Sequence, residues 1–307
     1  MKTRWLKVVL LTAALSIGCS GHNGGSVATI PATVEEGWAA LPNVEGSLKF
    51  AVLGDWGTGF SGQYNLAAQM AKFHDKFKFE SVITVGDNLY GLQRPQDYIA
   101  KFERPYAPLL ANGVKFYASL GNHDSRKQVN YEQFNMGGKF YYTLAFPDQS
   151  VRFFMLDTTY PTPEQLDWVQ KELKGSDENW KIAVFHHPLY SSGMRHGSDL
   201  KLREALEGVF IANNVSVVFS GHDHVYERIK PQLGIVYFVT GSGGKLRSGT
   251  LRTNTGITDK GYDGGHAFLA VEIIGDEMFF NAITTDGSVV DSGIIVRRMP
   301  QNSGARP

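Results

Sequence analysis

The sequence holds a single cysteine, Cys19, among its 307 residues. One cysteine excludes an intramolecular disulfide, and it excludes a structural zinc site built from several thiolates. The chain also lacks an excess of charge, because Lys and Arg number 30 and Asp and Glu number 30. A neutral chain of this kind does not predict a nucleic-acid partner. No apolar run is long enough for a transmembrane helix, so we expect a packed core and non-thiolate chemistry.

The N-terminal residues are typical of a secretion signal. A basic stretch at residues 2–7 precedes a mainly apolar run from Val8 to Ile17, which is too short to span a bilayer. Cys19 stands where a bacterial lipoprotein signal is cleaved, although Ser16 occupies a position that usually carries Leu. We predict a signal peptide over residues 1–19 and an exported protein, periplasmic or extracellular. A lipid anchor through Cys19 and simple secretion both stay open.

The rest of the chain divides by composition. Residues 20–46, rich in small residues and Pro, are predicted to be a linker or arm, residues 47–298 a single domain, and residues 299–307 a flexible tail. Up to about Ser220, short apolar runs alternate with helical patterns, which predicts α/β units with largely parallel strands. From Ala267 the pattern alternates with a period of two and predicts an antiparallel meander. We expect two packed sheets with helices outside.

Five predicted strands end in polar residues that commonly bind metal ions. They are Asp55 in AVLGDWG, Asp87 and Tyr90 in ITVGDNLY, Asn122, His123 and Asp124 in ASLGNHD, His186 and His187 in IAVFHHP, and His222 and His224 in VFSGHDH. Ligands of open α/β sheets gather outside the carboxyl ends of strands, so these residues are predicted to converge. Each fragment alone is an ordinary turn. Together they offer oxygen and imidazole donors that suit Fe, Mn or Zn, in a number that favours two ions rather than one.

The series GDWG…GDNLY…GNHD…HHP…GHDH resembles the calcineurin-like metallophosphoesterases, and among them the purple acid phosphatases of the tartrate-resistant type. The similarity covers about residues 48–244. Two coupled features single out the purple subgroup: Gly57 stands where the general family has a His, and Tyr90 stands where it has no Tyr. The resemblance implies an α/β fold, a four-layer α/β/β/α sandwich of two mixed sheets, with a metal site at the carboxyl ends of the strands.

The resemblance also implies two overlapping sets of metal ligands. The first ion would be held by Asp55, Asp87, Tyr90 and His224, and the second by Asp87, Asn122, His186 and His222. Asp87 would then bridge the two ions. Fe(III) is implied at the Tyr90 site, because a phenolate stabilises the trivalent ion and gives the charge-transfer band of the family. Fe(II), Zn or Mn is implied at the second site.

The implied activity is that of an acid phosphatase, which hydrolyses phosphomonoesters with a metal-bound hydroxide. Small phosphomonoesters or phosphoproteins are the expected substrates. His123 is predicted to contact the phosphate and protonate the leaving alkoxide, with His196 as the second substrate histidine. Two alternatives stay open: a phosphodiesterase acting on nucleotides or phospholipid headgroups, and a non-enzymatic, exported metal- or phosphate-binding protein. The sequence makes no prediction of oligomeric state.

The remaining polar residues receive mainly structural predictions. His187 is expected to support a ligand or to pack, Asp124 to orient a neighbouring group, and Asp157 to form a strand-end turn. His22, His74 and His266 are assigned no role in the metal site. The glycine-rich segment 241–266, which carries Lys245, Arg247, Arg252 and Lys260, is predicted to be a mobile loop at the edge of the metal cleft, able to touch the substrate.

Overall fold

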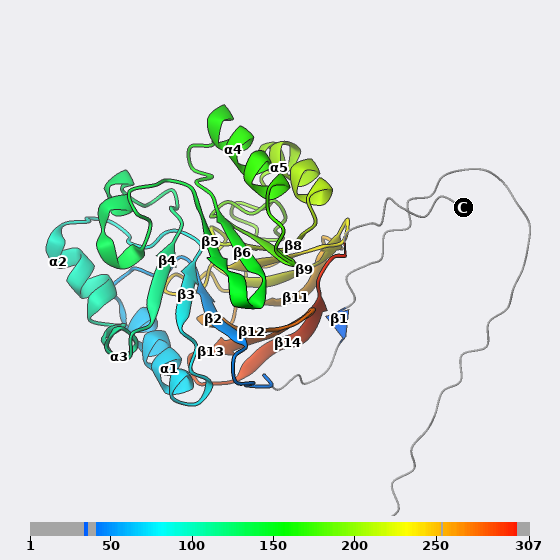
Figure 1. Cartoon of the computed structure of the whole chain (residues 1–307). Coiled ribbons are helices and arrows are strands. Elements are labelled where there is room, and N and C mark those ends of the chain that lie inside the picture. Colours follow the sequence, from blue (N-terminus) through cyan, green and yellow to red (C-terminus); the bar gives the residue numbers. More distant parts are fainter. Residues whose placement is uncertain (1–33, 36–40, 253, 300–307) are drawn as a thin grey trace, which may run out of the picture.

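Two seven-stranded mixed sheets pack face to face in this computed structural model, with helices on both outer faces (Figure 1). The structure describes residues 34–35, 41–252 and 254–299. The predicted four-layer α/β/β/α sandwich is therefore confirmed. The predicted signal peptide lies outside the described residues, as does nearly all of the predicted tail. The domain boundaries stay predictions.

The first sheet combines a parallel part with an antiparallel meander, in the order β1-β14-β13-β12-β2-β3-β4. Its strands are β1 (Val34–Glu35), β2 (Leu48–Leu53), β3 (Ser81–Thr84), β4 (Lys115–Ala118), β12 (Ala267–Ile274), β13 (Glu277–Thr284) and β14 (Val289–Val296). β2, β3 and β4 are parallel, and β12 to β14 form the predicted meander. The short β1, within the predicted linker, pairs with β14.

The second sheet has the order β11-β9-β10-β8-β7-β6-β5. Its strands are β5 (Tyr142–Phe146), β6 (Val151–Met155), β7 (Trp180–Val184), β8 (Val215–Ser220), β9 (Tyr226–Gln232), β10 (Ile235–Thr240) and β11 (Thr258–Tyr262). β6, β7, β8 and β10 are parallel, and the outer strands are antiparallel. Residues 241–266 were expected to form a mobile loop. This expectation is wrong for residues 258–262, which pair with β9 as strand β11.

The longer helices cover the outer faces of the two sheets. They are α1 (Ser61–Phe77), α4 (Pro163–Lys174) and α5 (Leu200–Ala212), and the shorter turns are α2 (Pro95–Tyr98), a π-helical turn (Ile99–Glu103), α3 (Ala107–Ala111) and 3-10 turns at Arg126–Asn130, Glu132–Phe134 and Pro147–Gln149. α1 to α3 lie on the side of the first sheet, and α4 and α5 on the side of the second (Figure 1). None of the helices within the described ranges is long and apolar enough to cross a membrane.

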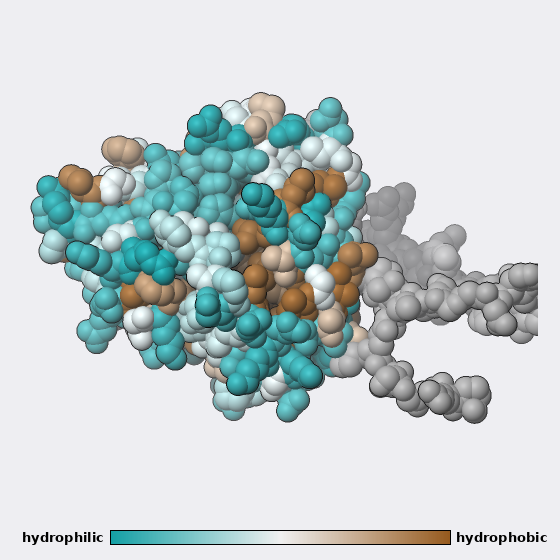
Figure 2. Space-filling view, turned by 90° about the horizontal axis from the view of Figure 1, so that it is seen from above, coloured by the Kyte–Doolittle hydropathy of each residue, from teal (hydrophilic) through white to brown (hydrophobic). Residues whose placement is uncertain are grey.

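The core lies mainly between the sheets. Phe50 of β2 meets Phe153 of β6 edge to face, with ring centroids 5.2 Å apart, and Phe238 of β10 meets Phe280 of β13 at 5.1 Å. Alternate residues of the second sheet, such as Val218, instead pack under α4 and α5. Strands buried on both faces hold their carboxyl ends in fixed positions. The surface seen from above is mainly hydrophilic, with hydrophobic residues in limited groups (Figure 2).

Candidate metal centre

Three of the predicted ligands follow a strand on a sharp turn of the backbone. Asp55 follows β2, Asp87 follows β3 and His222 follows β8, and these three non-glycine residues have φ angles of 55°, 52° and 72°. A left-handed backbone is uncommon for residues with a Cβ and is concentrated at functional sites. The turns bend the chain so that the side chains converge on one point between the two sheets.

The first predicted ligand set is brought together by the turns after β2, β3 and β8. Tyr90 donates its hydroxyl to Asp55 Oδ1 at 3.0 Å and lies 3.2 Å from His224 Nε2. His224 Nε2 in turn lies 3.4 Å from Asp55 Oδ1. Donor atoms of Asp55, Asp87 and His224 all fall within 4.8 Å of one another, and all three residues are buried. The geometry can therefore surround one ion.

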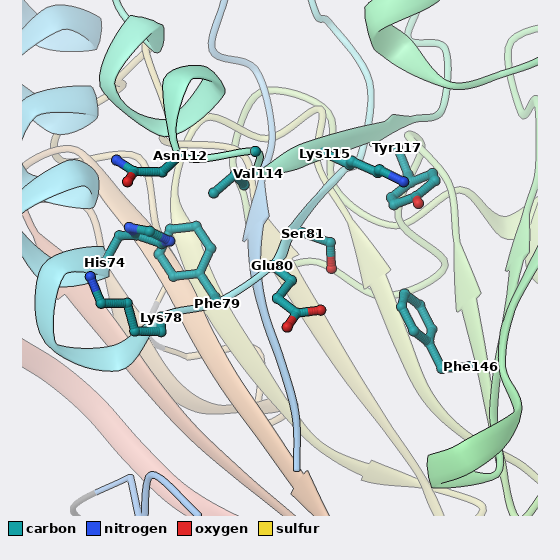
Figure 3. A pocket seen from close by; sticks show the side chains of 11 residues that line it. His74, Lys78, Phe79, Glu80, Ser81, Asn112, Val114, Lys115, Tyr117 and Phe146 are labelled. Atoms are coloured by element: carbon teal, nitrogen blue, oxygen red, sulfur yellow. The ribbon is translucent and has the colours of Figure 1, made fainter. Parts of the chain in front are cut away.

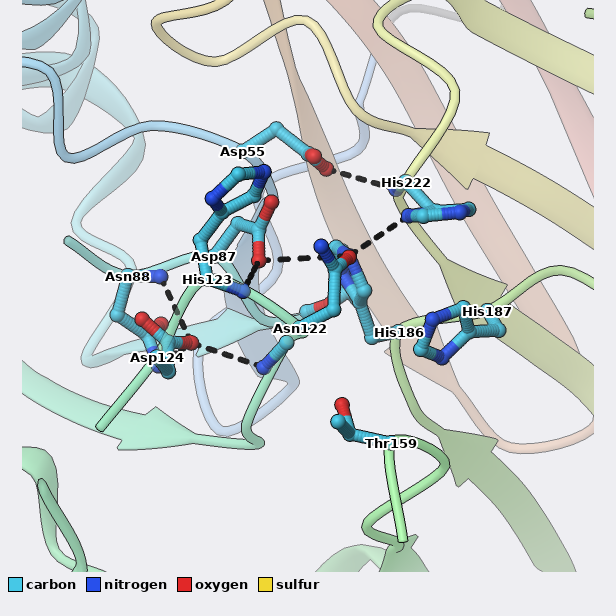
Figure 4. Close-up of polar contacts among 12 residues, drawn as sticks. Asp55, Asp87, Asn88, Asn122, His123, Asp124, Thr159, His186, His187 and His222 are labelled. Carbon is cyan, nitrogen blue, oxygen red and sulfur yellow. Dashed lines mark hydrogen bonds and ion pairs between the residues drawn. The ribbon is translucent and has the colours of Figure 1, made fainter. Parts of the chain in front are cut away.

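The second predicted set adjoins the first through Asp87. His186 Nε2 lies 3.0 Å from Asn122 Oδ1, 3.5 Å from Asp87 Oδ1 and 3.2 Å from His222 Nδ1 (Figure 4). His186 donates its Nδ1 proton to the carbonyl oxygen of Val85 at 2.9 Å. This hydrogen bond leaves the Nε2 lone pair free for an ion, which is the usual arrangement of a ligating histidine.

The buried acidic groups and neutral imidazoles of the centre favour the binding of cations. Burial, followed by the charge of Asp87, raises the pKa of Asp55 well above its usual range. Burial also raises the pKa of Tyr90, together with the charges of Asp55 and Asp87. Burial, followed by the charge of Arg247, lowers the pKa of His224 to about 3. The ring is therefore neutral, and one of its nitrogens can bind a metal ion through its lone pair. Two adjacent buried carboxylates with neutral imidazoles and a phenol match the donors of an iron, zinc or manganese centre.

Asp124 ties two ligand loops together through the backbone. Its Oδ2 accepts the N–H of Gly121 at 2.8 Å and of Asn88 at 3.0 Å, and its Oδ1 accepts the N–H of Leu89 at 3.0 Å (Figure 4). Gln128 donates its side-chain amide to Oδ1 at 2.8 Å. Burial and the charge of neighbouring Asp87 raise the pKa of Asp124 to about 7. Asp124 therefore orients the loops after β3 and β4. The sequence did not predict the supporting contacts of Asn88 and Gln128 with this carboxylate.

The two predicted catalytic histidines lie at the exposed rim of the same centre. The backbone N–H of His123 donates to Asp87 Oδ1 at 2.9 Å, and its exposed ring lies 4.8 Å from the ring of Tyr90. His196 is also exposed, and its ring lies 3.8 Å from the ring of His222. Both imidazoles therefore sit beside predicted ligands without being buried among them.

His187 and Asp157 lie next to the centre in supporting positions. His187 Nδ1 lies 3.0 Å from Thr158 Oγ1, and burial lowers the pKa of His187 to about 4. A ring nitrogen of His187 also falls within 4.8 Å of donor atoms of His186 and His222, so this ring is placed where it could contact a bound ion as well as pack. Asp157 Oδ1 accepts the N–H of Thr159 at 3.0 Å in a turn after β6, as expected.

A cleft of about 520 Å³ lies away from this centre. Its walls include His74, Phe79, Ser81 and Tyr117 (Figure 3). It opens at the start of β3 and β4, whereas the ligand loops follow the other ends of these strands. Its size alone does not make it the functional site, since none of the predicted ligands lines it.

A steric contact links the two features that distinguish the sequence from the general family. Tyr90 donates its backbone N–H to the carbonyl oxygen of Gly57 at 2.9 Å. A Cβ at Gly57 would lie 1.7 Å from the carbonyl oxygen of Asn88. The loop that delivers Tyr90 therefore occupies the space that any side chain at position 57 would need.

Comparisons with known proteins agree with this geometry. Residues 48–226, more than half of the chain, match the family model described as calcineurin-like phosphoesterase. Purple acid phosphatase 4 of Arabidopsis thaliana is 28% identical, over 77% of this chain and 80% of its own length. Tartrate-resistant acid phosphatase type 5 of Homo sapiens is 26% identical, over 85% of this chain and 93% of its own.

Solved structures share the fold. The purple acid phosphatase PPD1 of yellow lupin (Lupinus luteus) seeds superposes with a TM-score of 0.67 at 20% identity, over 84% of this chain and 55% of its own. GAP50, the anchor in the inner membrane complex of Plasmodium, superposes with a TM-score of 0.68 at 19% identity, over 83% of this chain and 90% of its own. At these identities the superpositions show the fold alone.

Proposed function

Because the chain belongs to the calcineurin-like phosphoesterase family, we propose that it hydrolyses phosphomonoesters at a dinuclear metal centre, as an acid phosphatase of the purple type. The observation that carries the proposal is the position of Asp87 between two donor sets. On one side lie Asp55, Tyr90 and His224, and on the other Asn122, His186 and His222. One carboxylate shared by two sets is the arrangement that a pair of ions requires.

The protein residues would hold the ions and the substrate in place. When bound, a pair of ions supplies a water nucleophile of lowered pKa and neutralises charge on the phosphate. Buried strand ends and the hydrogen bonds of Asp124 keep the donor side chains preorganised. The bridging position of Asp87 fixes the spacing of the two donor sets. No nucleophilic side chain is required, so the reaction needs no covalent phospho-enzyme.

We assign the proton donation to His123. Its ring is exposed beside Tyr90, where a leaving alkoxide could receive a proton. Burial lowers the pKa of His196, although the charge of Asp223 opposes this shift. Because of the lowered pKa, a smaller fraction of His196 is protonated at a given pH. We therefore expect His196 mainly to donate a hydrogen bond to the phosphate.

The donors support a proposal for the two metals. We propose Fe(III) at the site with the Tyr90 phenol, because a phenolate favours a trivalent ion, and Fe(II), Zn or Mn at the second. Metal analysis and a visible spectrum of protein purified without added metal test this assignment. Two ions per chain and a visible absorption band are expected. A colourless wild type that holds only Mn or Zn would contradict the ferric assignment and leave the dinuclear centre intact.

Substrate tests separate the proposed activity from its alternatives. Wild-type protein is expected to hydrolyse an aryl phosphate much faster than a bis-aryl phosphate, with mildly acidic pH favoured. The reverse preference would indicate a phosphodiesterase. His123→Ala is expected to lower kcat by about 10²–10⁴ for an alkyl phosphate and by less for an aryl phosphate, whose leaving group needs less protonation. Equal turnover of wild type and His123→Ala would favour a binding protein.

We further propose that the protein is exported and acts on small phosphomonoesters or phosphoproteins. The support is the predicted signal at residues 1–19. Cell fractionation of wild type and Cys19→Ser separates the two forms of export. Loss of membrane association in the variant alone would indicate a lipid anchor, and equal release of both would indicate secretion without one.

A further inference from the structure

We propose that Lys245 and Arg247 form an anion-binding rim beside the metal centre, which selects phosphoesters whose leaving group carries a further negative charge. Inorganic diphosphate, an anhydride whose leaving group is orthophosphate, is the smallest substrate that presents such a leaving group. This inference rests on the proposed hydrolysis of phosphoesters and names the substrates that the same centre prefers. It concerns the leaving-group side of the site, to which none of the predicted ligands contributes a positive charge.

The backbone fixes the position of Lys245. Gly244 and Lys245 donate their N–H groups to the carbonyl oxygen of Asp55 at 3.0 and 2.8 Å. A Cβ at Gly244 would lie 2.0 Å from the carbonyl oxygen of Trp56, so the segment is docked closely on the first ligand loop. The Lys245 ammonium lies 4.7 Å from the centroid of the Tyr90 ring. The rim is therefore anchored to the loop that carries Asp55.

Lys245 shares the Tyr90 ring with the predicted proton donor. The rings of Tyr90 and His123 have centroids 4.8 Å apart. A leaving group protonated by His123 would emerge beside this ring, within reach of the flexible lysine stem. A second anionic group on the leaving group would therefore meet the ammonium of Lys245.

Arg247 makes a hydrogen bond that a bound metal ion would disfavour. Its Nε donates to His224 Nδ1 at 3.1 Å, and its backbone N–H donates to the carbonyl oxygen of His224 at 3.1 Å. A neutral imidazole that binds an ion through Nε2 keeps its proton on Nδ1, and Nδ1 then cannot accept from Arg247. Loading of the centre would release the guanidinium, whose planar donors match a phosphate or carboxylate.

Neither cation has a carboxylate partner within the part of the chain that the structure describes. By contrast, Arg126 is paired with Asp157, and Arg228 is paired with Asp291. Unpaired cations at the mouth of a cleft attract anionic ligands and raise their local concentration. Lys245 and Arg247 therefore lie beside the metal centre without a carboxylate that would compete with a bound anion.

The kinetic test compares two substrates in matched variants. We would measure kcat/KM for inorganic diphosphate and for phenyl phosphate at fixed pH and ionic strength, and take the ratio of the two. The ratio is expected to fall about tenfold or more in Lys245→Met, because a charge-assisted hydrogen bond is lost, and to be retained in Lys245→Arg. Lys260→Met is the control, since Lys260 is an exposed lysine of β11 within the same segment. An equal loss for both substrates in Lys245→Met would overturn the proposal and leave Lys245 as a support for Tyr90.

A binding test is independent of turnover. Calorimetry of the metal-loaded protein would compare imidodiphosphate, which resists hydrolysis, with orthophosphate. The preference for imidodiphosphate is expected to fall about tenfold in Lys245→Met and in Arg247→Gln, with the metal content of both variants unchanged. Wild-type protein that binds imidodiphosphate no more tightly than orthophosphate would overturn the proposal. Binding preference without hydrolysis of either substrate would contradict the proposed function and keep the rim.

Discussion

Gly57→Ala tests whether the loop of Tyr90 and the absence of a side chain at position 57 depend on each other. In the structure a Cβ at Gly57 would lie 1.7 Å from the carbonyl oxygen of Asn88 and 2.8 Å from Cα of Leu89. Contacts under 3.0 Å essentially never occur for a Cβ, so the loop must move by about 1.3 Å or more. The clash is with backbone, which cannot be relieved by a change of rotamer.

The displacement is large compared with the tolerance of a metal ligand. Ligand distances hold within about 0.2 Å, so a shift of this size would withdraw the Tyr90 oxygen from its ion. Tyr90 is tied to position 57 by its hydrogen bond of 2.9 Å and cannot stay behind when the loop moves. Overpacking of this kind costs about 1–3 kcal/mol, or a fall in Tm of about 2–12 °C for a domain of this size.

The assay is a visible spectrum with metal analysis and a thermal melt. Gly57→Ala is expected to lose the phenolate absorption band although Tyr90 is still present. The double variant Gly57→Ala/Tyr90→Phe should lose no more of this band than either single variant. Gly208→Ala is the control, because a Cβ at this helical glycine of α5 meets nothing within 4 Å. A wild-type band and metal content in Gly57→Ala would refute the steric link.

Four further outcomes are expected. Tyr90→Phe should remove the visible band while the protein stays folded, and an unchanged band would assign the colour elsewhere. Asp87→Ala should lose both ions, and one full retained equivalent would contradict the bridging role. Asp124→Ala should weaken metal binding by about 10–100-fold, because it frees two ligand loops, and unchanged affinity in a titration would contradict its clamping role. Metal removal should lower Tm more at pH 8 than at pH 5. Burial raises the pKa values of Asp55 and Asp124 in the folded protein without metal. The stability that these two groups contribute is fully present below about pH 4, and it is lost as pH rises through about 7, the pKa of Asp124. A Tm of the metal-free protein that does not depend on pH would contradict this.

Sequence reasoning predicted the fold and the gathering of the ligands because both depend on local patterns. The alternation of apolar runs with helical patterns predicted the order of strands and helices. The carboxyl ends of parallel strands in the two sheets bring Asp55, Asp87 and His186 together. The period-two alternation after Ala267 predicted a meander that the structure contains. These signals lie within a few residues of one another and need no knowledge of tertiary contacts.

Contacts between distant loops were beyond reach of the same reasoning. Asp124 accepts from Asn88, which is separated from it by 36 positions, and Arg247 donates to His224 across 23. Nothing in the local pattern around Asp124 distinguishes an acceptor of backbone N–H groups from an orienter of a histidine ring. The strand Thr258–Tyr262 was likewise hidden, because its glycine-containing sequence has weak strand propensity and forms through pairing with β9.

The choice between a metal-binding centre and a purely structural scaffold depends on the donors rather than the fold. This fold is shared by a purple acid phosphatase and by the anchor GAP50, so fold similarity alone favours neither. Asp55 is fully buried with a raised pKa and a left-handed backbone, and each of these features lowers folding stability in the absence of a cation. A chain that served only as a scaffold could replace Asp55 with an uncharged residue at no functional loss. Its presence beside Asp87, Tyr90 and His224 is therefore best explained by an ion whose binding offsets that cost.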